Sequence, residues 1–312
     1  MEDSILGIHH ITAIAGDAKR NFDFYTQVLG LRFIKKTVNF DDPYTYHFYF
    51  GDEFGNAGTI LTFFPWGKSV GRGLRGAGIA TEIGYSVPKG SLDFWKERFE
   101  KHGVIYNKPT VKFGEKYLTF IDPDGLKLQL IETEKPDNRI AWETDEIKQA
   151  VALKGFHSVT LTLNEQAPTA QILTEIFGYE LIQKDGVSYR YATNAIDTAA
   201  IIDIVEYPEE PRGWVAGGIV HHVAFRVKND EVLMQFREKI KNMGLDITHQ
   251  IDRNYFHSLY FREPGGILFE IATENPGFTV DEPLAELGKN LKLPIQYESD
   301  RKEIERQLAV LD

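Results

Sequence analysis

The sequence contains no cysteine among its 312 residues. This absence excludes disulfide bridges, zinc–thiolate sites and a cysteine nucleophile. The sequence also has no amino-terminal signal segment and no apolar run long enough to span a bilayer. We therefore expect a cytoplasmic protein that does not associate with membranes.

An excess of positive charge is also missing. Lysine and arginine together number 35 against 46 aspartate and glutamate residues, which gives a net charge of −11 spread along the chain. Because nucleic-acid-binding domains usually carry a basic patch, the charge argues against a nucleic-acid partner. Hydrophobic residues make up 42% and charged residues 26% of the chain. This composition is typical of a globular protein, and the length is sufficient for two domains.

The chain repeats one pattern: a strand, a helix and three further strands. The strands predicted to open each copy cover residues 8–15, 81–87, 156–163 and 220–227. Apolar residues then recur at helical spacing, as Phe22, Tyr25 and Leu29 do in the first copy. Glycines suited to ending these helices are Gly30, Gly103, Gly178 and Gly244. The repeat predicts an α+β fold of four βαβββ modules in two similar halves.

The predicted boundaries follow from this repeat. Residues 1–135 form an N-terminal half with two modules, and residues 151–275 form a C-terminal half with two modules. A polar link over residues 132–138 and a short helical stretch to Ala150 are expected between them. Residues 276–312 form a C-terminal tail with a short helix, where Asp300 and Glu303 resemble a capping box.

Two His-His pairs stand in opening strands, His9-His10 and His221-His222. Glu270 lies within the apolar strand Ile-Leu-Phe-Glu-Ile. Burying a carboxylate among the apolar residues of a strand costs free energy unless another group pairs with it. Two imidazoles and a carboxylate converging from strands are the ligand set of a non-haem Fe(II) site with open positions. The sequence therefore predicts a metal-dependent oxygenase.

The repeated module, its strand histidines, the Phe24-Tyr25 helix and the turn Asp122-Pro123-Asp124-Gly125 resemble the vicinal oxygen chelate (glyoxalase/extradiol dioxygenase) superfamily. More narrowly, the His-His pairs with Thr12, Arg253 and Glu270 resemble the Mhq-type hydroquinone ring-cleaving dioxygenases. This resemblance implies Fe(2+)-dependent cleavage of a small aromatic diol, of the hydroquinone or catechol type, by O₂. It is compatible with a catabolic or a detoxifying role and with a homo-oligomer.

The resemblance also implies the ligands. In the first module of the family the metal ligand lies fifteen residues before the helix tyrosine, and counting back from Tyr25 gives His10. His222 is its counterpart, so His10, His222 and Glu270 are the implied metal ligands, and modules one and four would build one cup. Because successive strand residues point to opposite faces, only one histidine of each pair should face this cup unless the strand is irregular.

The catalytic residues implied by the resemblance are His9, Thr12, His221, Arg253 and Tyr260. His9 and His221 would act on a substrate proton or orient the neighbouring ligand. Arg253 would stabilise negative charge on oxygen, or would be a surface arginine paired with Asp252. Tyr260, together with His257, would line the pocket of the aromatic ring, or Tyr260 would belong to the core.

A rival ligand set stays open at this point. His157 stands in the opening strand of the third module, and Asp203 lies in a later strand of that module. With His222 and Glu270 they would resemble the catechol dioxygenase layout, in which modules three and four are paired. His47, His102 and His249 have no partner pattern and are expected on the surface.

Two other functions use the same fold. A glyoxalase-like isomerase usually has a first-module carboxylate where this chain has Leu61. A metal-free protein that sequesters aromatic compounds or drugs would lack the ligands. The fold alone does not choose among these functions.

Overall fold

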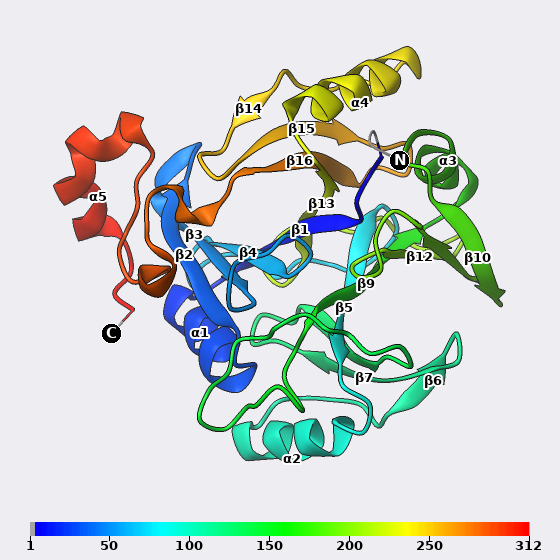
Figure 1. Cartoon of the computed structure of the whole chain (residues 1–312), viewed down its shortest axis with the longest axis horizontal. Helices are drawn as coiled ribbons and strands as arrows, with labels where there is room; N and C mark the ends of the chain where they lie inside the picture. Colours follow the sequence, from blue (N-terminus) through cyan, green and yellow to red (C-terminus); the bar gives the residue numbers. More distant parts are fainter. Residues whose placement is uncertain (1–3, 312) are drawn as a thin grey trace.

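The computed structural model describes residues 4–311 and confirms an α+β fold of four βαβββ modules (Figure 1). Module one comprises β1 (Ile8–Ala15), α1 (Ala18–Asp23), a π-helical turn (Phe24–Val28), β2 (Arg32–Asn39), β3 (Asp42–Gly51) and β4 (Ile60–Pro65). Module two comprises β5 (Ile79–Val87), α2 (Leu92–His102), β6 (Thr110–Lys112), β7 (Glu115–Ile121) and β8 (Lys127–Glu132). Module three comprises β9 (Gly155–Leu163), α3 (Ala167–Gln171), a π-helical turn (Ile172–Ile176), β10 (Glu180–Asp185), β11 (Ser188–Ala192) and β12 (Ile201–Glu206). Module four comprises β13 (Val220–Val227), α4 (Asp230–Asn242), β14 (Ile251–Asp252), β15 (Phe256–Arg262) and β16 (Leu268–Pro276).

The modules form two eight-stranded sheets, and each sheet takes one module from each half of the chain. The first sheet has the order β14-β15-β16-β13-β1-β4-β3-β2, from modules four and one. The second has the order β10-β11-β12-β9-β5-β8-β7-β6, from modules three and two. The opening strands pair antiparallel at the centre of each sheet, β1 with β13 and β5 with β9. The two halves of the chain are therefore interlocked.

The first sheet curls until its two ends meet. The Arg253 guanidinium, just after β14, lies 5.5 Å from the ring centroid of Phe40 and 3.9 Å from the Asp41 carboxylate, between β2 and β3. The inner face of this sheet therefore encloses a cup. Figure 1 shows β14 and β15 crossing above β1 and β13, with β2 and β3 rising beside them.

The helices pack against the outer faces of the sheets. In module one the Tyr25 ring packs against Phe63, with 4.6 Å between the ring centroids, and in module two Trp95 and Phe99 are the fully buried aromatic residues of α2. Burying one such side chain contributes roughly 1.5–3 kcal/mol. Alternation along the strands leaves the inner face of the first sheet with His10, Thr12 and other polar residues. Among residues 4–311 no helix is both long and apolar enough to cross a membrane.

The link between the halves differs from the sequence-based expectation. Residues 133–154 contain turns but no helix, so the predicted helical stretch to Ala150 is wrong. The Gln149 side chain bonds both the backbone nitrogen and the backbone oxygen of Ala141, at 3.2 and 2.6 Å. The Thr144 hydroxyl accepts from the backbone nitrogen of Ile147 at 3.1 Å. These side chains satisfy backbone groups locally, which competes with helix formation.

The C-terminal tail packs against the first sheet. It contains 3₁₀ turns over Phe278–Val280, Leu284–Glu286 and Ile295–Asp300 and the helix α5 (Arg301–Gln307). Phe278 packs 5.2 Å from the ring of Tyr49, and Lys35 on β2 is fully buried beneath the tail. The Lys35 ammonium lies 2.7 Å from Asp281 and 2.6 Å from Glu282. The tail is therefore held to the first sheet by a buried cation.

The predicted capping box at α5 is wrong. Asp300 makes no side-chain hydrogen bond to the start of the helix. Glu303 instead bonds the side chains of Arg306 and Gln307 within the helix, Gln307 at 2.5 Å. These partners lie three and four residues ahead of Glu303, where neighbours on one helix face meet.

We predict that Lys35→Met destabilises the fold by about 3–5 kcal/mol, because it leaves the buried Glu282 carboxylate without its cation. The free energy of unfolding in urea would measure this. Lys36→Met is the matched control, since Lys36 is the next residue on β2 and is only partly buried. Equal stability of the two variants would contradict a stabilising role for the ion pairs of Lys35 with Asp281 and Glu282.

Candidate metal centre

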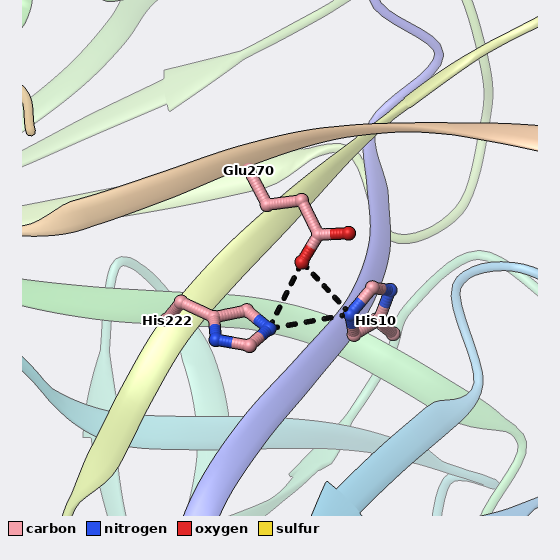
Figure 2. Close-up of side chains that lie close together, drawn as sticks. All are labelled: His10, His222 and Glu270. Carbon is pink, nitrogen blue, oxygen red and sulfur yellow. Dashed lines mark hydrogen bonds and ion pairs between the residues drawn. The ribbon is translucent and has the colours of Figure 1, made fainter. Parts of the chain in front are cut away.

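Three side chains from three adjacent strands meet on the inner face of the first sheet. Figure 2 shows His10 from β1, His222 from β13 and Glu270 from β16 pointing toward one another. The Nε2 atoms of His10 and His222 lie 3.2 and 2.9 Å from Oε2 of Glu270. The two Nε2 atoms are 3.4 Å apart. All three residues are buried.

The Glu270 carboxylate shows what this arrangement is suited to hold. One oxygen, Oε1, accepts a hydrogen bond from the Ser258 hydroxyl. The other, Oε2, is buried and accepts no hydrogen bond with acceptable geometry, although it faces both imidazoles. An oxygen and two imidazole nitrogens that converge in this way have the geometry of cation ligands. The donor set also suits a divalent transition metal.

The protonation states agree with this geometry. Burial alone would raise the pKa of Glu270, but His10 and His222 hold it well below its ordinary value. Burial lowers the pKa of His222 and outweighs the opposing effect of Glu270. At neutral pH the site therefore offers a carboxylate and a neutral imidazole, the forms that bind metals.

Both His-His pairs lie on β-bulges. Along β1 and β13, Ile8 pairs with Phe225 and His10 with Ala224, which leaves His9 as the extra residue. Further along, Thr12 pairs with His222 and Ala13 with Val220, which leaves His221 as the extra residue. A bulge redirects a side chain that regular alternation would send to the opposite face. Strict alternation therefore fails at these two positions.

Each bulged histidine contacts the histidine that follows it. Nδ1 of His9 lies 2.8 Å from Nδ1 of His10, and Nδ1 of His221 lies 2.8 Å from Nδ1 of His222. Burial, followed by the adjacent histidine, lowers the pKa of His9 and of His221 to about 3. Both are therefore neutral and can accept an Nδ1–H from their neighbours. With their hydrogens on Nδ1, His10 and His222 direct their Nε2 lone pairs toward Glu270.

A cavity of about 340 Å³ adjoins the triad. Its walls include the following residues on the inner face and its rim: His10, Asn39, Phe40, Asp41, His47, Tyr49, Phe64, Trp66, His221, His222, Thr248, Ile251, Arg253, Phe256, Tyr260 and Leu268. The size of the cavity and its mixture of aromatic and polar side chains suit a small aromatic ligand that carries polar groups.

The structure gathers most of the predicted catalytic residues around this cavity. His221, Arg253 and Tyr260 line it, and Nε of Arg253 lies 3.3 Å from the Tyr260 hydroxyl. His9 is buried behind His10, outside the cavity lining. Thr12 is also buried and is not among the residues that line the cavity; its hydroxyl lies 2.8 Å from that of Thr62.

Two histidines lie elsewhere than expected. His257 does not line the ring pocket, because its Nδ1 is 2.6 Å from the Asp230 carboxylate on α4. His47 is buried rather than on the surface, and it lines the cavity beside Tyr49. Inward-facing alternation along β3 was the signal that could have identified His47 and Tyr49. His102 and His249 are exposed, as expected.

The rival set does not assemble. His157 is the bulged residue of β9, so it corresponds to His9, and Ser158 occupies the position of His10. His157 lies 2.9 Å from Glu115, and both oxygens of Asp203 bond the Arg190 guanidinium, at 2.8 and 2.9 Å. Within residues 4–311 the one cluster with metal-binding geometry is His10, His222 and Glu270.

The chain is similar to known proteins over nearly its whole length. Residues 7–130 and 142–271 match the model of the Glyoxalase/Bleomycin resistance protein/Dioxygenase superfamily. A Bacillus subtilis (strain 168) protein named "Putative ring-cleaving dioxygenase MhqO" is 46% identical over 99% of this chain and 97% of the relative. The "Chlorohydroquinone/hydroquinone 1,2-dioxygenase" of Sphingobium indicum is 35% identical over 99% of this chain and 97% of the relative. The crystal structure of a "putative dioxygenase" from Bacillus subtilis subsp. subtilis str. 168 has a TM-score of 0.95 at 45% identity, covering 99% of this chain and 98% of that one.

We predict that the triad binds one divalent ion per chain. His10→Ala and Glu270→Ala should abolish stoichiometric binding, because each removes one of only three protein ligands. Elemental analysis after anaerobic loading with Fe(II) would measure it. His157→Ala is the matched control, a buried strand histidine in the second sheet, and should keep full metal content. Loss of metal from His157→Ala with retention in His10→Ala would reverse the assignment.

Proposed function

Because the chain belongs to the glyoxalase/bleomycin resistance protein/dioxygenase superfamily, we propose that it is a ring-cleaving dioxygenase for hydroquinone-type aromatic diols. In this proposal His10, His222 and Glu270 hold a single Fe(II) ion, and O₂ is the second substrate. The convergence of three ligand atoms at the wall of a small aromatic cavity carries the proposal. The names of full-length relatives support the same class of reaction.

The residues present fit such an ion. Two imidazoles and one carboxylate on one side are the facial ligand set of non-haem Fe(II) oxygenases and leave the remaining positions open. When bound, Fe(II) would supply neighbouring positions for a phenol oxygen and for dioxygen, and a path for electrons between them. Proximity on one centre replaces an otherwise improbable encounter of the two reactants.

The remaining wall residues have separate tasks. Phe64, Phe256 and Leu268 give the ring an apolar surface and limit the access of water. His221 has its Nδ1 committed to His222, so its Nε2 is the atom available to exchange a proton with a substrate hydroxyl. Arg253 brings a fixed positive charge to the cavity beside Tyr260. We assign it the stabilisation of negative charge that develops on oxygen.

We predict that the Fe(II)-loaded protein consumes dioxygen with hydroquinones and yields a ring-opened product with new absorbance. The metal-free protein should not, because nothing would then join the ring and dioxygen. An oxygen electrode and a panel of hydroquinones and catechols would measure this. Turnover of a hemithioacetal without oxygen uptake would instead identify an isomerase.

We predict that Arg253→Ala lowers kcat by roughly 10²–10³-fold while metal content stays unchanged, because a charge-stabilising group is lost and no ligand is. Arg262→Ala is the matched control, since Arg262 is an exposed arginine on β15 outside the cavity wall. Steady-state kinetics with metal analysis would measure both variants. Equal losses in the two would remove Arg253 from the reaction.

A further inference from the structure

A chain of hydrogen bonds crosses the wall of the cup from β1 to β3. The Thr12 hydroxyl lies 2.8 Å from that of Thr62, and Thr62 Oγ1 lies 2.9 Å from Nε2 of His47. Nδ1 of His47 lies 3.0 Å from the Tyr49 hydroxyl. All four residues are buried, and the triad uses none of them. Thr12, Thr62 and Tyr49 are register partners across β1, β4 and β3.

The hydrogen bonds of this network can run in two directions, and each direction leaves one hydroxyl hydrogen without an acceptor: that of Thr12, which does not line the cavity, or that of Tyr49, which does. The neutral form of His47 has one N–H, and burial lowers its pKa well below the ordinary value. If Tyr49 donates to His47, the remaining bonds run toward Thr12, whose hydroxyl hydrogen then has no acceptor among residues 4–311. In the opposite direction Thr12 donates to Thr62, Thr62 to His47 and His47 to Tyr49. Every buried hydrogen is then bonded except that of the Tyr49 hydroxyl.

This spare donor lies at the cavity. Tyr49 and His47 both line the space that His10 and His222 line. β3 is separated from β1 by β4, and the curl of the sheet carries the β2–β3 end toward β14 and β15. Tyr49 and the triad therefore belong to different parts of one curved wall that lines a single cavity.

The second sheet provides an internal comparison. Asp203 pairs with Thr160 and Arg190 there, as Thr62 pairs with Thr12 and Tyr49 in the first sheet. Arg190 therefore occupies the register position of Tyr49. Its guanidinium reaches inward to Asp203 on one side and Glu115 on the other. A side chain at this register position is thus directed into its cup, where it makes polar contacts.

We infer that Tyr49 donates a hydrogen bond to the second oxygen of the aromatic substrate, the oxygen that is not at the triad. His47, Thr62 and Thr12 are positioning residues that keep the Tyr49 hydroxyl a donor. This inference rests on the proposed function and names its specificity determinant. A ring with oxygens at opposite positions reaches both the triad and Tyr49. A ring with adjacent oxygens presents both to the triad and gains nothing from Tyr49.

Anaerobic ligand binding tests this without turnover. The probes are hydroquinone against 4-methylphenol, and 4-methoxyphenol against 4-ethylphenol, a nearly isosteric pair that differs by one acceptor oxygen. Calorimetric titration of the Fe(II)-loaded protein should show about 10-fold tighter binding of the oxygen-bearing member of each pair, the effect of one buried hydrogen bond. Because an ether oxygen only accepts, the second pair reports specifically on donation by the protein.

Tyr49→Phe should abolish both preferences and leave the binding of 4-ethylphenol unchanged. His47→Phe should act in the same way, and His47→Gln should restore the preference, since an amide can again accept from Thr62 and donate to Tyr49. Tyr85→Phe is the matched control, because it removes a buried hydroxyl of the second sheet that has no hydrogen-bond partner. Its preferences should equal those of the unaltered protein.

Three results would overturn the inference. Preferences retained in Tyr49→Phe would remove Tyr49 from recognition. If 4-methoxyphenol bound as weakly as 4-ethylphenol while hydroquinone bound tightly, Tyr49 would accept rather than donate. If the unaltered protein bound none of the phenols, the proposed function would fail and this inference with it, which separates that failure from the first two.

Discussion

The structure depends on one constraint: the Glu270 carboxylate must be buried beside two imidazoles. A buried charge is costly without partners, and here the two imidazoles come from different halves of the chain, since His10 and His222 are 212 positions apart in the sequence. The antiparallel pairing of β1 with β13 brings them together, and the parallel pairing of β13 with β16 adds Glu270. Neither half of the chain holds the triad alone. The interlocking of modules one and four is therefore both the architecture of the first sheet and the origin of its candidate metal centre.

The two sheets show how one fold supports an open cup and a closed one. At the register positions of His10, His222 and Glu270, the second sheet has Ser158, Glu82 and Gln129. Glu82 there bonds Lys127 and Gln129 instead of converging with two imidazoles. Arg190 stands in place of Tyr49 and joins Asp203 to Glu115, so a protein cation occupies that cup. Side chains on equivalent backbones, and not the fold, decide which cup can take a ligand.

Much of the fold follows from sequence pattern, because glycine-terminated amphipathic helices and apolar strands recur with one period. The opening strands β1 and β13 have the predicted bounds. Convergence of His10, His222 and Glu270 was predictable from the same repeat with the family resemblance. The bulges were not, since the extra residue exists only relative to a partner strand far along the chain. His47 and Tyr49 were missed for a related reason: their roles arise from contacts across β1, β4 and β3. The prediction of a helix in the link between the halves was wrong because side chains such as that of Gln149 bond the backbone groups that a helix would pair.

Isotope labelling is the most direct test of the account. The Fe(II)-loaded protein would be mixed with hydroquinone under ¹⁸O-labelled dioxygen for a single turnover, and the product analysed at once by mass spectrometry. Cleavage at a centre held by His10, His222 and Glu270 predicts a ring-opened product that contains both atoms of one dioxygen molecule, apart from label lost by exchange with water. A quinone that carries no label, formed by simple oxidation, or an unchanged ring would contradict the account.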